Sequence, residues 1–276
     1  MIRNILLTIA YDGTGFHGWQ RQPEEVTVQG HLEQVMSRLF KTEIILNGTS
    51  RTDAGVHACG QRASFKADLG IPVERIPLAV NNALCGAEKG PFAISPVRIL
   101  AAEEKPLNFH ARFDCAGKEY IYRIKNGGEP NIFERNYVYH VRERLDVPAM
   151  KRAAAKLKGT HDFKSFEASG GNPRETTVRT IYDIRIEEGA GRCEAAEDSA
   201  GINLVVRGDG FLYNMVRIIT GTLVDIGAGR IAAEEMQSII DAADRSRAGH
   251  TAPPNGLYLS EIYFDEAQLK QAARED

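Results

Sequence analysis

The chain of 276 residues lacks any long hydrophobic run. No segment approaches the roughly 18 consecutive apolar residues that suggest a membrane-spanning helix. The apolar start at Met1–Leu7 is superficially like a signal peptide, but Asp12 follows before any long apolar region, and no small-residue cleavage site comes after it. We therefore expect a cytoplasmic protein whose first strand begins near its N-terminus.

Cysteine is also scarce, and Cys59, Cys85, Cys115 and Cys193 share no CxxC or CxxxC spacing. Such spacings are typical of metal sites, and closely spaced cysteines are typical of disulfide frameworks in small secreted proteins. We expect neither. A nucleophilic role for Cys59, close to Asp53 in the sequence, is conceivable, but a buried and inert thiol is the better interpretation.

The chain has no large excess of positive charge, since its net charge is −3. This argues weakly against a nucleic-acid-binding protein, because such domains are usually basic. The charges are unevenly distributed, with acidic residues gathered at 187–198 and 265–276. The local field matters more than the net charge for binding a polyanion. Arginines flank the motifs described below: Arg21, Arg51, Arg62, Arg112, Arg179, Arg207 and Arg217.

The length fits about two domains of roughly 100–200 residues each. Hydrophobic periodicity in the first half predicts the order β-α-β-β-α-β, which is typical of a ferredoxin-like fold with a split βαβ arrangement. Thr27 is expected to cap the first helix, and the apolar stripe of that helix (Val28, Leu32, Val35, Met36, Leu39 and Phe40) is expected to face the core. The predicted strands are 4–11, 43–47, 61–66 and 92–100, and the predicted helices are 27–40 and 72–84.

A polar run with a proline at 101–106 predicts a boundary between domains 1–105 and 106–276. The second half repeats the same order with insertions. Strands are expected near 120–124, 137–141, 177–186, 202–207 and 257–264, and helices at 146–157, 212–226 and 232–243. We expect an α+β protein of two ferredoxin-like subdomains, whose antiparallel sheets join around a central catalytic cleft.

Gly13, Gly15 and Gly18 match the GxGxxG pattern of dinucleotide-binding proteins. In those proteins a helix opens within the glycines, whereas here the helical pattern begins only at Thr27. A loop that also carries Phe16, His17, Trp19 and Arg21 suits stacking on bases and contact with phosphates. A structural loop with a half-buried tryptophan is an equally good interpretation.

The stretch Ser50–Ala58 lies between two predicted strands and carries Arg51, Asp53 and Gly55. Gly55 permits a positive φ, so the backbone can bend sharply beside Asp53. Arg51 and Asp53, two residues apart in extended backbone, point to the same side, and the guanidinium favours the ionised carboxylate. A solvated surface ion pair is the ordinary interpretation of such a pair, and catalysis is the alternative.

The motifs of this chain, taken together, resemble the tRNA pseudouridine synthase A family over nearly the whole sequence. The most specific of them is the run RTDAGVHA at Arg51–Ala58. Ser50 stands where many members have glycine, a departure that bears only on the geometry of the loop. The other matching stretches are Tyr11–Thr14, Gly18–Gln20, Thr27–Gln29, Gly60–Gln61, Phe109–Phe113, Lys118–Tyr122, Gly159–Phe163 with Phe166, Asn214–Arg217 with Gly221, and Gly256–Leu259.

The resemblance implies isomerisation of uridine to pseudouridine at positions 38, 39 and 40 of the tRNA anticodon stem-loop, by a homodimer without cofactor or metal. It implies that Asp53 is the catalytic carboxylate and that Arg217 contacts it. Attack at C1′, attack at C6 and removal of the C2′ proton all remain open for Asp53. The resemblance makes Tyr120 the active-site tyrosine that stacks on the flipped uracil.

Four further side chains complete the expected site. We expect Arg51 to occupy the space of the departing nucleotide, and Arg21, Trp19 and Arg112 to bind substrate. Tyr122 is interpreted as a core residue, and His57 and His161 as structural hydrogen-bonding residues. Two rival functions are a non-catalytic RNA-binding module and a nucleoside hydrolase that uses a carboxylate.

Overall fold

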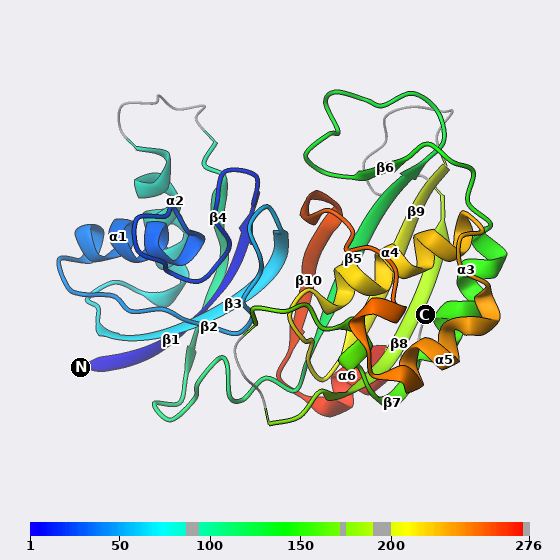
Figure 1. Cartoon of the computed structure of the whole chain (residues 1–276). Coiled ribbons are helices and arrows are strands. Elements are labelled where there is room, and N and C mark those ends of the chain that lie inside the picture. Colours follow the sequence, from blue (N-terminus) through cyan, green and yellow to red (C-terminus); the bar gives the residue numbers. More distant parts are fainter. Residues whose placement is uncertain (87–93, 172–174, 190–199, 273–276) are drawn as a thin grey trace. The chain divides into compact units, whose positions relative to one another are not determined.

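The computed structural model describes residues 1–86, 94–171, 175–189 and 200–272. These residues form two compact α+β units, coloured from blue to red along the chain in Figure 1. Unit 1 comprises Met1–Cys115 with Leu259–Phe264, and unit 2 comprises Ala116–Tyr258 with the residues from Asp265 onward. Among the described residues, no helix combines the length and the apolar character needed to cross a lipid bilayer.

Unit 1 is a mostly antiparallel sheet with two α-helices. Its strands follow the order β4-β1-β3-β10, and the short β2 also pairs with β3. The helices α1 and α2 contact each other, and α2 packs against β4. In chain order the elements are β1 (Ile2–Tyr11), α1 (Val28–Phe40), β2 (Asn47–Gly48), β3 (His57–Asp68), a 3-10 turn (Val73–Arg75), α2 (Ile76–Cys85), β4 (Val97–Lys105) and the end of β10 (Leu257–Tyr263).

The first helix forms as the sequence predicts. Thr27 caps it by accepting a hydrogen bond from the Gly30 amide at 3.3 Å. Three members of the predicted stripe, Val28, Leu32 and Met36, are fully buried, whereas Leu39 is 37% exposed. The stripe is therefore narrower than predicted, and its C-terminal end faces solvent.

The predicted strand at 43–47 is wrong except for its last residue, because β2 covers only Asn47–Gly48. Side chains of α1 accept hydrogen bonds from backbone amides of this stretch that would otherwise donate to a neighbouring strand. Ser37 Oγ accepts from the Ile44 amide, and the Glu33 carboxylate accepts from the Leu46 amide, both at 2.9 Å. Ile44 and Leu46 are buried and Ile45 is 53% exposed, and none of the three lies in a strand.

The last strand of the first half also lies later than predicted, since β4 spans Val97–Lys105. Residues 92 and 93 of that prediction lie outside the described residues. The polar run 101–105, interpreted as a boundary, pairs with β1 in the register Asn4↔Lys105. Its polarity reflects an edge strand with exposed Glu103 and Glu104. The two compact units divide after Cys115 instead.

The strands of unit 2 follow the order β5-β9-β8-β7 with antiparallel pairing, and β6 pairs with β5 in parallel. Helix α3 packs against α4 and β8, and α4 contacts β5. Its elements are β5 (Gly117–Asn126), β6 (Tyr139–Val141), α3 (Val147–Ala154), β7 (Gly159–Asp162), β8 (Val178–Glu188), β9 (Ala200–Gly208), α4 (Met215–Gly227), α5 (Met236–Ala242) and α6 (Glu266–Ala272).

The helix predicted at 146–157 is present as α3 with a 3-10 turn at Ala155–Leu157, and Asp146 caps α3 at the Ala149 amide. The helix predicted at 212–226 is present as α4, which begins three residues later. The expected stripe of α4 is buried throughout, from Leu212 to Leu223. Two elements, β7 and α6, were not predicted, because both are short and lack a clear period.

The last strand, β10, lies in the C-terminal half of the sequence, but most of it belongs to unit 1. Its residues from Leu259 onward belong to unit 1, where β10 neighbours β3. The two backbones approach so closely at Gly60 that a Cβ there would lie 2.4 Å from the carbonyl oxygen of Ser260. Local periodicity predicts a strand but does not say which sheet it joins.

The unequal burial along α1 generates a stability prediction. Met36→Ala removes a fully buried side chain and is expected to lower the free energy of unfolding by about 2–5 kcal/mol. Leu39→Ala, three residues along the same helix and partly exposed, is expected to cost less than about 1 kcal/mol. Urea denaturation of both variants measures the difference, and equal losses would contradict the observed orientation of α1.

Candidate active site

Asp53 lies in the loop of residues 49–56 between β2 and β3, here called the Asp53 turn. Gly55 has a φ of +77°, which confirms the predicted sharp bend. The Val56 amide donates to the Asp53 carbonyl at 3.2 Å, and the Gly55 amide donates to the Phe16 carbonyl at 3.3 Å. Asp53 is half-buried and Arg51 is exposed. The carboxylate is thus carried by a loop whose backbone is hydrogen-bonded both within itself and to the glycine-rich loop.

The glycines at 13–18 allow two backbones to touch. Gly18 has a φ of +86°, and a Cβ there would lie 2.6 Å from the Thr52 carbonyl oxygen. A Cβ at Gly13 would lie 2.1 Å from the Val56 carbonyl oxygen. No helix opens within these glycines, since α1 begins at Val28. In this structure, the pattern that matches a dinucleotide motif therefore brings the glycine-rich loop against the Asp53 turn.

Trp19 supports the same turn from inside unit 1. Its ring is only 1% exposed, its centroid lies 6.0 Å from that of Tyr11, and Gly48 leaves room for the indole nitrogen. The Trp19 amide donates to the Thr52 carbonyl at 3.0 Å, and the hydroxyls of Tyr11 and Thr52 are 2.7 Å apart. This burial, more complete than predicted, leaves no ring face for a base.

His57 fastens the other end of the turn. The side chain is 2% exposed, and Nδ1 accepts a hydrogen bond from the Gly13 amide at 3.1 Å. The Asp12 carboxylate lies 3.3 Å from the same nitrogen and accepts from the Thr14 amide and hydroxyl. These contacts fit the structural hydrogen-bonding role that the sequence suggests for His57.

Two further predicted residues, Arg21 and Arg112, also belong to unit 1, and both are exposed. The Arg21 guanidinium lies 3.3 Å from the buried Glu33 carboxylate, and its amide donates to Gln29 Oε1 at 3.0 Å. Arg112 stands on a turn after β4, with its guanidinium carbon 6.0 Å from the Phe113 ring centroid.

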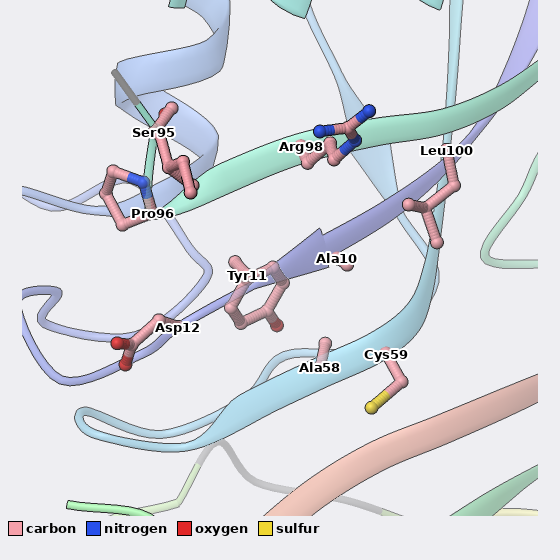
Figure 2. Close-up of a pocket in the computed structure, with 10 residues that line it drawn as sticks. Ala10, Tyr11, Asp12, Ala58, Cys59, Ser95, Pro96, Arg98 and Leu100 are labelled. Atoms are coloured by element: carbon pink, nitrogen blue, oxygen red, sulfur yellow. The ribbon is translucent and has the colours of Figure 1, made fainter. Parts of the chain in front are cut away.

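A hollow of about 670 Å³ lies close to the Asp53 turn, with its lining drawn in Figure 2. Tyr11 and Asp12 line it, and both contact the turn through Thr52 and His57. Neither Arg51 nor Asp53 is among its lining residues. We therefore assign this hollow no part in chemistry at the carboxylate.

Unit 2 holds the remaining predicted residues, Tyr120 and Arg217. Tyr120 on β5 is 6% exposed and meets Phe211 edge to face, with centroids 5.2 Å apart. Its neighbour Tyr122 is fully buried, as predicted for a core residue, and donates to the Pro253 carbonyl at 2.6 Å. Burial raises the pKa of Tyr122, and the positive charge of Arg217 acts against that rise.

Arg217 lies in the first turn of α4, as predicted, and its guanidinium is fixed from two sides. Nε donates to the Ala252 carbonyl at 2.8 Å, and a terminal nitrogen donates to Asn214 Oδ1 at 2.7 Å. Asn214 reaches this position with a φ of +59° at the helix start. The orientation of the guanidinium is thus set by backbone and side chain together.

The segment Gly249–Pro253, which sequence analysis missed, runs along α4 and holds Arg217. The Ala252 amide donates to the Arg217 carbonyl at 3.1 Å, and the Gly249 amide donates to Thr222 Oγ1 at 2.9 Å. The His250 amide and ring both bind the Asp225 carboxylate at 3.1 Å. These contacts join residues that are distant in sequence, and the only local signal in the sequence is Pro253 with the adjacent Pro254.

Two glycines of the glycine-rich loop are expected to differ in their tolerance of an alanine side chain. Gly18→Ala forces a left-handed non-glycine residue against the Thr52 carbonyl, and we expect a loss of about 1–3 kcal/mol in the free energy of unfolding. A Cβ at Gly15 meets nothing within 4 Å, so Gly15→Ala is expected to change stability by less than about 1 kcal/mol. Chemical denaturation of both variants measures their free energies of unfolding. A Gly18→Ala variant as stable as wild type would refute the close packing of Gly18 against the Thr52 carbonyl.

Asp225 generates a prediction about pH. Desolvation alone would raise the pKa of its carboxyl, but hydrogen bonds from His250 and Arg230 hold that pKa below its usual value. A lowered folded-state pKa stabilises the protein above the unfolded pKa of about 3.9, and the contribution is lost as pH falls further. Asp225→Asn should cost about 1.5–3 kcal/mol at neutral pH, and less at pH about 3.

Urea denaturation at the two pH values measures this difference. Asp241→Asn, an exposed carboxylate on α5, is the control and should change little at either pH. An Asp225→Asn loss that is equal at both pH values would refute the role of the charged carboxylate.

Comparison with known proteins agrees with these motifs and their geometry. A family model described as tRNA pseudouridine synthase matches residues 7–114 and 153–265. The chain is 43% identical to tRNA pseudouridine synthase A 2 of Clostridium tetani over 96% of its own length and all of that protein. It is 43% identical to tRNA pseudouridine synthase A of Acetivibrio thermocellus over 95% of its own length and all of that protein.

A third relative, tRNA pseudouridine synthase A of Halalkalibacterium halodurans, is 45% identical over 98% of this chain and 95% of that protein. These matches include the whole Asp53 turn and the start of α4 with Arg217. The chain belongs to the tRNA pseudouridine synthase family.

Proposed function

We propose that this protein isomerises uridine to pseudouridine in tRNA, at positions 38, 39 and 40 of the anticodon stem-loop. The observation that carries the proposal is the family match over both units together with the RTDAGVHA run at Arg51–Ala58. Relatives that the chain matches over nearly its full length bear the name tRNA pseudouridine synthase A.

The reaction breaks the bond between uracil N1 and ribose C1′ and forms a bond between C5 and C1′. N1 gains a proton and C5 loses one, so atoms and charge balance without an external oxidant or reductant. A carboxylate suits each available route, namely attack at C1′, attack at C6, or removal of the C2′ proton. We assign this carboxylate to Asp53, which is half-buried on a glycine-supported turn.

The contacts around the turn support that assignment. Backbone hydrogen bonds join Thr52 to Trp19 and Gly55 to Phe16, and the buried His57 fixes the end of the turn. A catalytic group held this way needs little reorganisation when substrate arrives. The same constraint keeps the carboxylate in one place while the base detaches and turns.

We assign supporting roles to two residues of unit 2. Arg217 supplies a permanent positive charge for the same carboxylate, and the Ala252 carbonyl and Asn214 orient its planar fork. Tyr120 stacks on the flipped uracil, and its hydroxyl takes part in proton transfer at C5. Base flipping costs a few kcal/mol, and an aromatic platform returns about 1–3 kcal/mol of that per base.

Three exposed or turn-borne residues complete the proposed RNA contacts. Arg51 takes the space of the departing nucleotide, while Arg21 and Arg112 bind phosphate oxygens. All three side chains are exposed. Trp19 is left out of the contact set because its ring is buried.

We further propose that each unit is a ferredoxin-like subdomain and that the protein acts in the cytoplasm as a homodimer. The order β1-α1-β2-β3-α2-β4 in unit 1, with β1 between β3 and β4 and β2 paired with β3, supports the split βαβ arrangement. A dimer would place a second set of arginines along a large polyanionic substrate, which suits a chain of net charge −3.

One experiment separates this function from its two rivals. The protein is incubated with a uridine-labelled tRNA transcript, and the products are digested to nucleosides and resolved. Pseudouridine supports isomerisation, free uracil supports a hydrolase, and unchanged uridine on bound tRNA supports a non-catalytic RNA-binding module.

Within that assay, Asp53→Asn is expected to lower the rate by at least about 10⁴-fold, as loss of a central catalytic group does. Binding of tRNA should be kept, because the amide has the same shape. Asp68→Asn, an exposed carboxylate at the end of β3, is the matched control and should remain active. A variant at Asp53 with near-normal turnover would refute the assignment.

A further inference from the structure

The segment that follows β4 presents an exposed aromatic side chain beside two basic ones. Phe113 is a large aromatic residue and is nevertheless 75% exposed. His110 is half-buried and Arg112 is exposed in the same turn. Unit 1 therefore displays an aromatic ring next to groups that favour a polyanion, here called the Phe113 turn (residues 109–114).

The ring of Phe113 is supported on one side by its neighbours. The His110 ring centroid lies 4.3 Å from that of Phe113 at an interplanar angle of 35°, close to a stacked arrangement. The Arg112 guanidinium carbon lies 6.0 Å from the same centroid. Most of the remaining ring surface stays in solvent.

Local hydrogen bonds make the Phe113 turn rigid. The amides of Phe113 and Asp114 donate to the His110 carbonyl at 3.1 and 3.0 Å. The Asp114 carboxylate accepts from the His110 amide at 2.8 Å, and His110 Nδ1 accepts from the Arg112 amide at 3.1 Å. The Asp114 carboxylate within the turn is thus engaged in closing it, and the imidazole is oriented by the backbone.

The turn is also fixed to the element that carries Asp53. Ala111 is fully buried, its amide donates to Ser64 Oγ on β3, and its carbonyl accepts from Thr49 Oγ1, both at 3.1 Å. Thr49 precedes Asp53 by four residues, so at most about 14 Å of chain separates this anchor from the proposed catalytic residue. An RNA whose target uridine lies at Asp53 therefore has neighbouring bases within about 14 Å of this anchor.

We propose that Phe113 is a stacking site for an unpaired base of the tRNA anticodon loop next to the uridine at Asp53, with Arg112 binding the adjoining phosphate. This inference rests on the proposed function. A pre-positioned aromatic ring stacks on any base, because every base has a π face, and an adjacent arginine adds cation–π and phosphate contacts. Stacking holds the loop open while the target uridine is out of its own stack.

The surroundings favour RNA over a second copy of this chain as the occupant. The ring is flanked by Arg112 and His110, and the only nearby carboxylate in the described turn is held by a backbone amide. A second copy of this chain, with 34 Lys and Arg beside 37 Asp and Glu, offers little excess of negative charge to match these groups, whereas RNA brings bases beside phosphates.

The test uses an anticodon stem-loop in which unpaired bases are replaced one at a time by the fluorescent base 2-aminopurine. Wild type and Phe113→Tyr are expected to quench the fluorescence of one loop position on binding, because stacking quenches this base. Phe113→Leu keeps an apolar side chain without a π face. It should lose the quenching and bind about 5- to 150-fold more weakly, the range for one lost stack.

Leu107→Ala removes an apolar side chain that is 56% exposed in the same connection and is the matched control, expected to bind and quench like wild type. Normal quenching and affinity in Phe113→Leu, while wild type makes pseudouridine, would overturn this inference alone. A changed oligomeric state in Phe113→Leu with normal quenching would identify the occupant as a second copy and overturn it too. Absence of pseudouridine with wild type would instead refute the proposed function.

Discussion

The contact on which the candidate site depends is the approach of two backbones, the loop Gly13–Gly18 against the turn that carries Asp53. Both glycines that make this approach would collide with carbonyl oxygens of the turn if they carried a Cβ. Buried side chains then lock the pair, with Trp19 beneath Thr52 and His57 bonded to the Gly13 amide. Backbone packing at this distance leaves few alternative positions for the carboxylate.

Local chemistry made part of the structure predictable. The capped helix at Thr27, the bend at Gly55 and the buried stripe of α4 follow from rules that act within a few residues. The most specific site signal, the run around Asp53, was equally local. Periodicity and capping therefore account for elements whose environment matches their own sequence pattern.

What could not be predicted depends on partners distant in sequence. The stretch 43–47 fails to become a strand because Glu33 and Ser37 bind its amides. Trp19 is buried because Gly48, far along the chain, leaves room for its ring. The segment that orients Arg217 is tied to α4 through Ala252 and His250, and no spacing in the sequence announces those bonds.

The late position of β10 in the chain has a consequence for biosynthesis. One of the strands beside β3 is made of residues from Leu259 onward, so unit 1 lacks that strand until synthesis is nearly finished. Until then a nascent chain exposes the unprotected edge of β3, the kind of surface that recruits chaperones or templates aggregation. A fragment ending at Cys115 would keep that edge exposed permanently. Unit 1 is compact in the folded protein, but no continuous stretch of the chain encodes all of it and nothing else.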